Sequence, residues 1–166
     1  MLKMRPSKVG IIYASLFVFI SAVIFIFAGF SGDVSSSQSG FVVNVLNSIL
    51  RFFGVVLNEG ELAGFALFVR KFFGHFLIFL IDGVFAYLAL YKLFSFKKNL
   101  IILLFGVLLM FLVAGISEFI QFFAGGRSAN WIDVAIDLGG ATIGLIIAFA
   151  FTIKTNEKAG NEPASI

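Results

Sequence analysis

The stretch EFIQFFAGGRSANWIDVAID, from Glu118 to Asp137, joins two strongly apolar parts of the chain. Its centre is rich in glycine and polar residues, whereas long apolar runs lie before and after it. This pattern predicts that the chain turns back here between two helices. Acidic residues near the ends of both helices are unusual next to lipid and indicate a polar site or an interhelical contact.

The composition of the whole chain explains the apolar runs. Of its 166 residues 60% are hydrophobic and 13% are charged, and the mean hydropathy is +1.08. A soluble protein is about half apolar and about one quarter charged. The chain is therefore expected to be an integral membrane protein. It contains no cysteine, which excludes disulfides and cysteine-based metal sites.

Four segments are long enough to cross about 30 Å of hydrocarbon at about 1.5 Å per residue. The sequence therefore predicts an all-α membrane protein with four transmembrane helices, at residues 9–30, 72–94, 100–123 and 133–153. The first segment is longer than the apolar core of a signal peptide and ends in FAGF. We therefore expect it to be retained as a helix.

Lysine and arginine predict the orientation of the four spans. Residues 1–8, 95–99 and 154–166 together contain seven of these residues, against four in the longer regions 31–71 and 124–132. We therefore expect both termini and the short loop on the cytoplasmic side, with the last segment disordered. The net charge of +3 lies at the segment ends, so it indicates membrane topology and gives no reason to expect nucleic-acid binding.

The long outer loop, residues 31–71, has two parts. Residues 31–40, SGDVSSSQSG, have the composition of a flexible spacer. Residues 41–57 predict an amphipathic helix that lies in the membrane interface, and residues 61–71 a short helix that leads into the second span. The polar stripe of the amphipathic segment consists of Asn44, Asn47, Ser48, Arg51 and Asn58. The same pattern also fits a re-entrant segment or a cap over the bundle.

Polar side chains gather near the outer ends of spans two to four. His75 lies one turn inside the second span, Glu118 and Gln121 lie near the end of the third, and Asp133 and Asp137 lie in the first turns of the fourth. A carboxylate at the bilayer centre costs at least about 2.5–3.5 kcal/mol, so such residues usually face the bundle interior. Their convergence predicts an outward-facing polar pocket, although ion pairs that only lock the helices together remain an alternative. Asp82, about 10 Å deeper than His75, has no assigned role.

The chemistry of each residue suggests a role. Histidine is the residue type most often used as a general acid or base, so His75 is the candidate for that role, with Glu118 as the group that orients it or as the acid itself. Gln121 can donate to an oxyanion, and Arg127 in a glycine-containing turn suits a phosphate or carboxylate. Asp133 is a ligand-binding candidate that also suits a helix cap. Asp137 is a further ligand-binding candidate.

The same residues supply donor atoms for a divalent cation, namely His75, Glu118, Asp133 and Asp137. The sequence contains no HExxH pair and no second histidine. We therefore assign no metal from the sequence, and the cofactor stays unknown. Farther along the fourth span, Gly140, Gly144 and Ala148 favour a close approach between helices on a face near the acids.

The stretches that contain these residues resemble the VanZ-like family of small bacterial membrane proteins. They are RKFFGHF (70–76), EFIQFF (118–123) with the following GGR, and DVAIDLGGATIG (133–144). The resemblance extends over about residues 65–151 and adds Lys71, from the basic pair before the histidine, to the ligand-binding candidates. Two departures are the four-residue step from Lys71 to His75, where many members have three, and Asp137, where many have asparagine.

The resemblance implies a multi-pass protein of the bacterial cytoplasmic membrane. The founding VanZ protein is linked to resistance to teicoplanin, a lipid-bearing glycopeptide. Three hypotheses stay open. The pocket binds a lipidated glycopeptide, an envelope lipid or a lipid-linked envelope precursor; it is the site of an intramembrane hydrolase or transferase that acts on a lipid-linked substrate; or the chain is a structural or partner membrane protein. The sequence does not predict the oligomeric state.

Overall fold

The computed structural model describes residues 7–94, 99–126 and 130–161, and within these ranges the chain forms helices and no strand. Four helical stretches are long and apolar enough to cross a membrane, at Lys8–Ala28, Glu59–Leu93, Asn99–Phe123 and Trp131–Thr155. The prediction of an all-α protein with four membrane-spanning helices is therefore confirmed. In chain order the elements are α1 (Lys8–Ala28), α2 (Gly32–Phe52), α3 (Glu59–Val69), η1 (Arg70–Leu77), α4 (Ile78–Leu93), α5 (Asn99–Phe123) and α6 (Trp131–Asn161).

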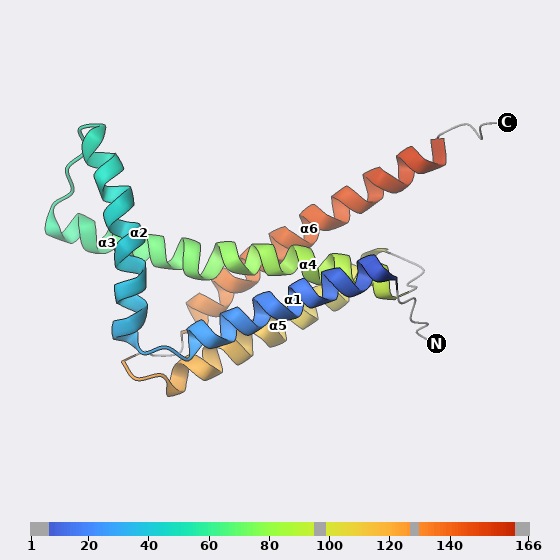
Figure 1. Cartoon of the computed structure of the whole chain (residues 1–166), viewed down its shortest axis with the longest axis horizontal. Coiled ribbons are helices and arrows are strands. Elements are labelled where there is room, and N and C mark those ends of the chain that lie inside the picture. Colours follow the sequence, from blue (N-terminus) through green and yellow to red (C-terminus); the bar gives the residue numbers. More distant parts are fainter. Residues whose placement is uncertain (1–6, 95–98, 127–129, 162–166) are drawn as a thin grey trace.

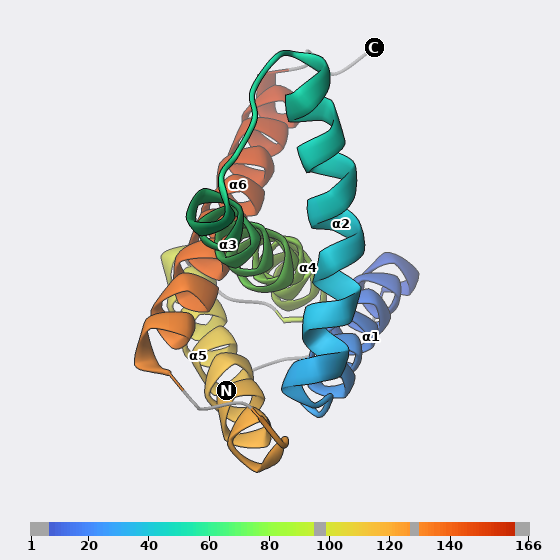
Figure 2. The same cartoon turned by 90° about the vertical axis from the view of Figure 1, so that its left-hand side faces the viewer.

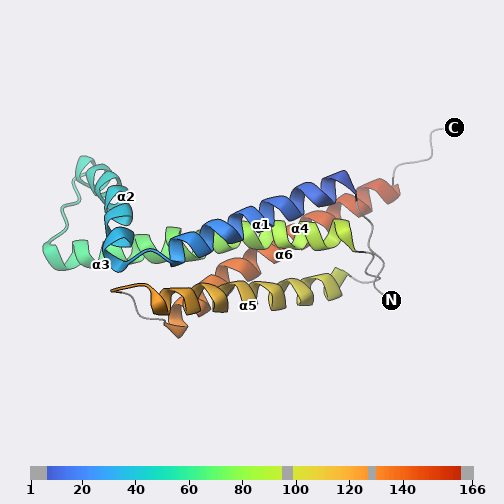
Figure 3. The ribbon, with the colours of Figure 1, turned by 60° about the horizontal axis from the view of Figure 1, so that its bottom comes forward.

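The helices α1, α4, α5 and α6 form the bundle. Seen end-on, α4 lies between the other three (Figure 2), and it packs most extensively on α6 and next on α1. The first turns of α1 and the last turns of α6 lie at the same end of the bundle (Figures 1 and 3). This arrangement agrees with termini on one side of the membrane; which side that is remains a prediction.

Glycines set the distance between α6 and the second span. A Cβ atom on Gly140 would collide with the carbonyl oxygen of Phe76, and one on Gly144 with that of Leu80. The close approach expected at these two positions is therefore present. It brings the start of α6, with its acidic residues, directly against η1.

Asp82 lies in the interior of the bundle, fully buried. Its carboxylate accepts a hydrogen bond from the hydroxyl of Ser21 at 2.9 Å, so it joins α4 to α1. The sequence left the role of Asp82 open; the structure gives it an interhelical contact within the bundle.

The outer loop differs from the sequence prediction. Residues 31–40 were expected to be a flexible spacer, but α2 begins at Gly32 and ends at Phe52, so the predicted helix 41–57 starts too late and ends too late. Ser31 caps the new start by accepting from the amide of Val34, and Asp33 lies in the first turn, where a negative charge is favourable. Gly54, with a φ of 82°, follows the helix end.

The helix α2 is steeply inclined to the long axis of the bundle and lies at the end opposite the first turns of α1 (Figure 1). Its large side chains Phe41 and Phe52 are exposed. An inclined helix with exposed phenylalanines is compatible with a position in the membrane interface. That position remains a prediction.

The carboxyl-terminal segment also differs. Disorder was predicted from residue 154, but α6 continues through Asn161. The segment KTNEKA contains no proline and several good helix formers, so it extends the helix that the fourth span begins. Residues 162–166 lie outside the described part of the chain.

Candidate functional site

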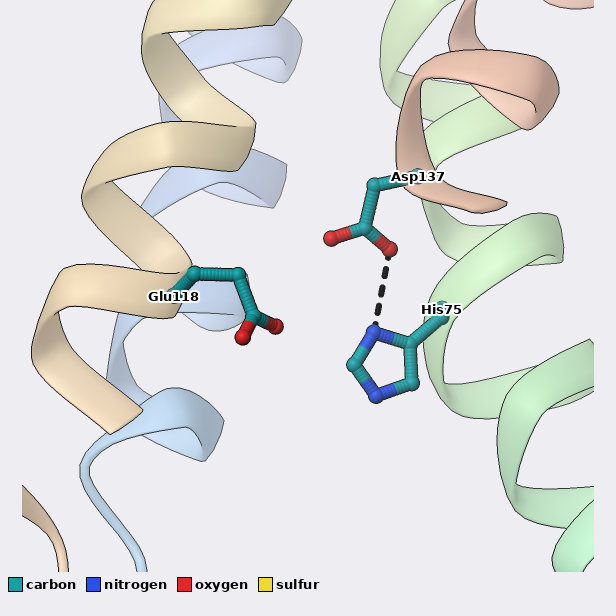
Figure 4. A group of neighbouring side chains, drawn as sticks. All are labelled: His75, Glu118 and Asp137. Carbon is teal, nitrogen blue, oxygen red and sulfur yellow. Dashed lines mark hydrogen bonds and ion pairs between the residues drawn. The ribbon is translucent and has the colours of Figure 1, made fainter. Parts of the chain in front are cut away.

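Three side chains from three elements meet at the end of the bundle near α2. His75 comes from η1, Glu118 from α5 and Asp137 from α6, and all three face one another (Figure 4). One donor atom of each lies within 4.8 Å of those of the other two. The three side chains are buried, with exposed fractions of 7%, 4% and 0%. The convergence predicted from the sequence is therefore present for these residues.

Asp137, rather than Glu118, orients the histidine. Its Oδ1 lies 3.0 Å from Nδ1 of His75 (Figure 4). The pairing of His75 with Glu118 that we predicted from the sequence is not the one observed. The physical reason is the tight packing of α6 on η1 at Gly140, which brings the short side chain of Asp137 directly to the imidazole.

Glu118 instead connects the end of α5 to the start of α6. Its carboxylate accepts from Nε2 of Gln121 at 3.0 Å and from the backbone amide of Asn130 at 2.9 Å. Gln121 therefore lies beside Glu118, with its amide nitrogen directed to that carboxylate. Its role as a donor to a bound oxyanion stays a prediction. Charge-assisted bonds of this kind are stronger than neutral ones, so the carboxylate is held in a fixed orientation.

Asn130 caps the start of α6, a role that we considered for Asp133. Its side-chain oxygen accepts from the amide of Ile132 at 3.0 Å, and its carbonyl accepts from the amide of Asp133 at 2.9 Å. Asparagine is among the preferred residues at this position, so Asn130 itself is the sequence signal for this helix start.

Asp133 is free to pair with Lys71, and the two form an ion pair at the mouth of the site. Lys71 and His75 are four residues apart on η1, and Asp133 and Asp137 are four apart on α6. Two successive pairs therefore connect these elements. Arg127, the remaining predicted ligand-binding residue, lies outside the described part of the chain.

The element η1 is a π-helix, a form that is rare and concentrated at functional sites. It covers Arg70 to Leu77 and so contains both Lys71 and His75. Its wider turns are continuous with α3 before it and α4 after it. Propensity and periodicity do not predict a π-helix, so this element was not expected from the sequence.

Two cavities adjoin the cluster. One has a volume of about 510 Å³ and is lined mainly by apolar side chains, among them Ile24, Phe27, Phe73 and Phe79. The other has a volume of about 420 Å³ and is lined mainly by polar ones, among them Asp33, Lys71, Asn130 and Asp133. Arg70, His75 and Gln121 line both. Arg70 was part of the recognised basic pair but not a predicted site residue.

Residues 11–152 match the family model described as VanZ/LLP1. The chain belongs to the VanZ/LLP1 family. The match begins well before residue 65, where the sequence resemblance began, so the VanZ/LLP1 region also includes α2 and most of α1. It contains every side chain of the site. Comparisons with curated proteins and with solved structures gave no match.

Proposed function

We propose that this VanZ-family membrane protein binds an amphiphilic molecule of the bacterial envelope. The observation that supports this function is the pair of adjoining cavities, one mainly apolar and one mainly polar, with Arg70, His75 and Gln121 on both walls. An acyl chain in the apolar cavity would place its headgroup at the histidine. Ligand sites commonly combine an apolar lining with a few polar groups that fix orientation.

The polar wall suits a phosphate that also bears an amine, hydroxyl or sugar group. Arg70 and Lys71 supply positive charge, and guanidinium and ammonium groups both bind phosphate. Asp33 and Asp133 bring negative charge to the same wall, with Asp133 paired to Lys71. A wall with both signs favours a headgroup with donors as well as an anion.

The predicted orientation opens both cavities on the extracytoplasmic side of the cytoplasmic membrane. Candidate occupants are an envelope phospholipid, a lipid-linked envelope precursor and a lipidated glycopeptide such as teicoplanin. By holding the drug or its lipid surroundings, the protein would lower the access of teicoplanin to its target. The family membership supports this role because of the link between VanZ and teicoplanin resistance.

Gly74→Leu tests the proposal by filling the apolar cavity. Gly74 lines that cavity, and an added Cβ meets no atom within 4 Å, so the variant is expected to fold. We expect it to bind phosphatidylglycerol with a fluorescent tail at least about tenfold more weakly than wild type, in titrations of detergent-solubilised protein. Teicoplanin should displace the probe from wild type, whereas vancomycin, without an acyl tail, should not.

Gly115→Leu is the matched control, because Gly115 is exposed on α5, lines neither cavity and also has open space at its Cβ. It should bind the probe as wild type does. Equal binding by wild type, Gly74→Leu and Gly115→Leu would show that the lipid covers the outer surface only, and would refute the proposal.

Catalysis on a lipid-linked substrate is a second candidate function, favoured by the His75–Asp137 pair. A buried carboxylate that holds an imidazole in place is the usual arrangement of a histidine that acts as a general base. In this case His75 would move a proton at the bound headgroup and Asp137 would orient it. Mass spectrometry of the bound lipid over time distinguishes catalysis from binding, since binding alone leaves the lipid unchanged.

A further inference from the structure

The His75, Glu118 and Asp137 cluster has the composition and spacing of a metal site. We propose that these three side chains bind one divalent transition-metal ion, of the Zn²⁺ or Mn²⁺ type. The sequence suggested these residues as possible donors, but it has no HExxH pair and no second histidine, so no metal was assigned from it. The proposal does not depend on the bound amphiphile.

The distances fit ligands of a common ion. Bonds of about 2.0–2.2 Å place neighbouring ligand atoms about 3.0–3.5 Å apart around a four- or six-coordinate ion. Nδ1 of His75 and Oδ1 of Asp137 are 3.0 Å apart, and a donor atom of Glu118 completes a group within 4.8 Å. Small side-chain rotations would therefore bring all three onto one ion.

A buried carboxylate oxygen without a partner is the second observation. Oδ2 of Asp137 has no hydrogen-bond partner, and the residue is fully buried. In Figure 4 one oxygen of Asp137 faces His75 and the other points to the side on which Glu118 lies. A buried acceptor that lacks a partner is unfavourable, and a cation between the carboxylates would satisfy it.

The charges in the cluster lead to the same conclusion. Glu118 and Asp137 are two buried carboxylates, and no lysine or arginine among the described residues pairs with either. The nearby Lys71 is paired with Asp133, which removes Asp133 from the ligand set that the sequence suggested. The hydrogen bonds of the two carboxylates to His75, Gln121 and Asn130 do not bring a lysine or arginine charge to the cluster, and a divalent ion would balance the negative charge of both carboxylates.

The donor atoms and the residues around them indicate which metal ion the site would bind and how. One imidazole and two carboxylates combine the preferences of Zn²⁺ and Mn²⁺. Gln121 and the amide of Asn130 already hold the Glu118 carboxylate, as outer partners commonly do for metal ligands. Three protein ligands leave a position open, and His75 lines both cavities, so that position would face the bound headgroup.

The test is Zn²⁺ titration, with Mn²⁺ as the second probe, of full-length protein in detergent after treatment with EDTA. We expect one ion per chain by calorimetry and by elemental analysis. His75→Ala, Glu118→Gln and Asp137→Asn should each weaken binding at least about tenfold, since loss of even an outer partner commonly weakens metal binding this much. Asp82→Asn, the same change at a buried acid outside the cluster, should leave the affinity unchanged.

Thermal unfolding shows whether a variant fails for structural reasons. Zn²⁺ should raise the unfolding temperature of wild type and Asp82→Asn, because an ion that binds the native protein stabilises it. It should not raise that of folded Asp137→Asn, which lacks a ligand. Wild type that binds neither ion, or Asp137→Asn and Glu118→Gln with wild-type affinity, would overturn the proposal. Lipid binding by the EDTA-treated protein is measured separately, so the two proposals can fail independently.

Discussion

Gly140→Ala is expected to lower the free energy of unfolding by about 1–3 kcal/mol, the usual effect of added atoms in a well-packed core. The new Cβ would collide with the backbone carbonyl of Phe76, which cannot rotate away as a side chain can. Relief requires α6 to move off η1. Because Asp137 is three residues earlier on α6, the same movement would stretch the His75–Asp137 contact.

Gly139→Ala is the control for this prediction. Gly139 is the preceding residue on the same helix, and a Cβ there meets no atom within 4 Å. It should unfold at or slightly above the wild-type temperature, because alanine favours a helix more than glycine does. The measurement is thermal unfolding in detergent, monitored by circular dichroism. Equal stability of the two variants would contradict the packing described for α6.

Glu118→Ala is expected to lower the free energy of unfolding by about 3–6 kcal/mol, given about 1.5–3 kcal/mol for each of two bonds to a charged group. It removes the acceptor of Gln121 Nε2 and of the Asn130 amide. Asn130 is the residue that caps α6, so the start of that helix should loosen. Hydrogen exchange would locate the change at the first turns of α6.

Glu118→Gln separates the role of Glu118 as an acceptor from that of its charge. Glutamine retains a carbonyl oxygen for the Asn130 amide but carries no negative charge. We expect Glu118→Gln to lose less than half as much unfolding free energy as Glu118→Ala. Metal binding should weaken to the same extent in both variants. If both variants were as stable as wild type, the bonds of Glu118 would not stabilise the start of α6.

The sequence predicted the features of the fold that depend on local composition. Hydropathy and length were sufficient for the four spans, and helical spacing placed Asp133 and Asp137 on one face of the last one. The prediction of a flexible spacer at residues 31–40 was wrong. Serine and glycine favour a spacer on average, but here Ser31 caps a helix that the following residues form.

Within the described part of the site, the convergence of His75, Glu118 and Asp137 was predicted from the sequence, but their pairing was not. The choice of Asp137 over Glu118 as the partner of His75 depends on how closely α6 approaches η1, a tertiary distance that glycines set. The two cavities likewise arise only when the helices are packed, and propensity and periodicity do not predict the π-helix that contains Lys71 and His75.

The two pairs between η1 and α6 also support a structural role, because they hold these elements together. A cluster that served only this purpose would need neither adjoining cavity. The experiments above therefore record stability and binding on the same preparations. Loss of probe binding in Gly74→Leu at unchanged stability would favour a ligand site over a purely structural contact.

The most direct test of an outward-facing site is the sidedness of the polar cavity. The chain has no cysteine, so single substitutions can be labelled without background. Ser36 is exposed and lines the polar cavity, and Thr155 is exposed near the other end of the bundle. In intact cells, a membrane-impermeant maleimide should label Ser36→Cys, and should label Thr155→Cys only after permeabilisation. Labelling of Thr155→Cys but not Ser36→Cys in intact cells would place the site on the cytoplasmic face and contradict a role at the outer surface.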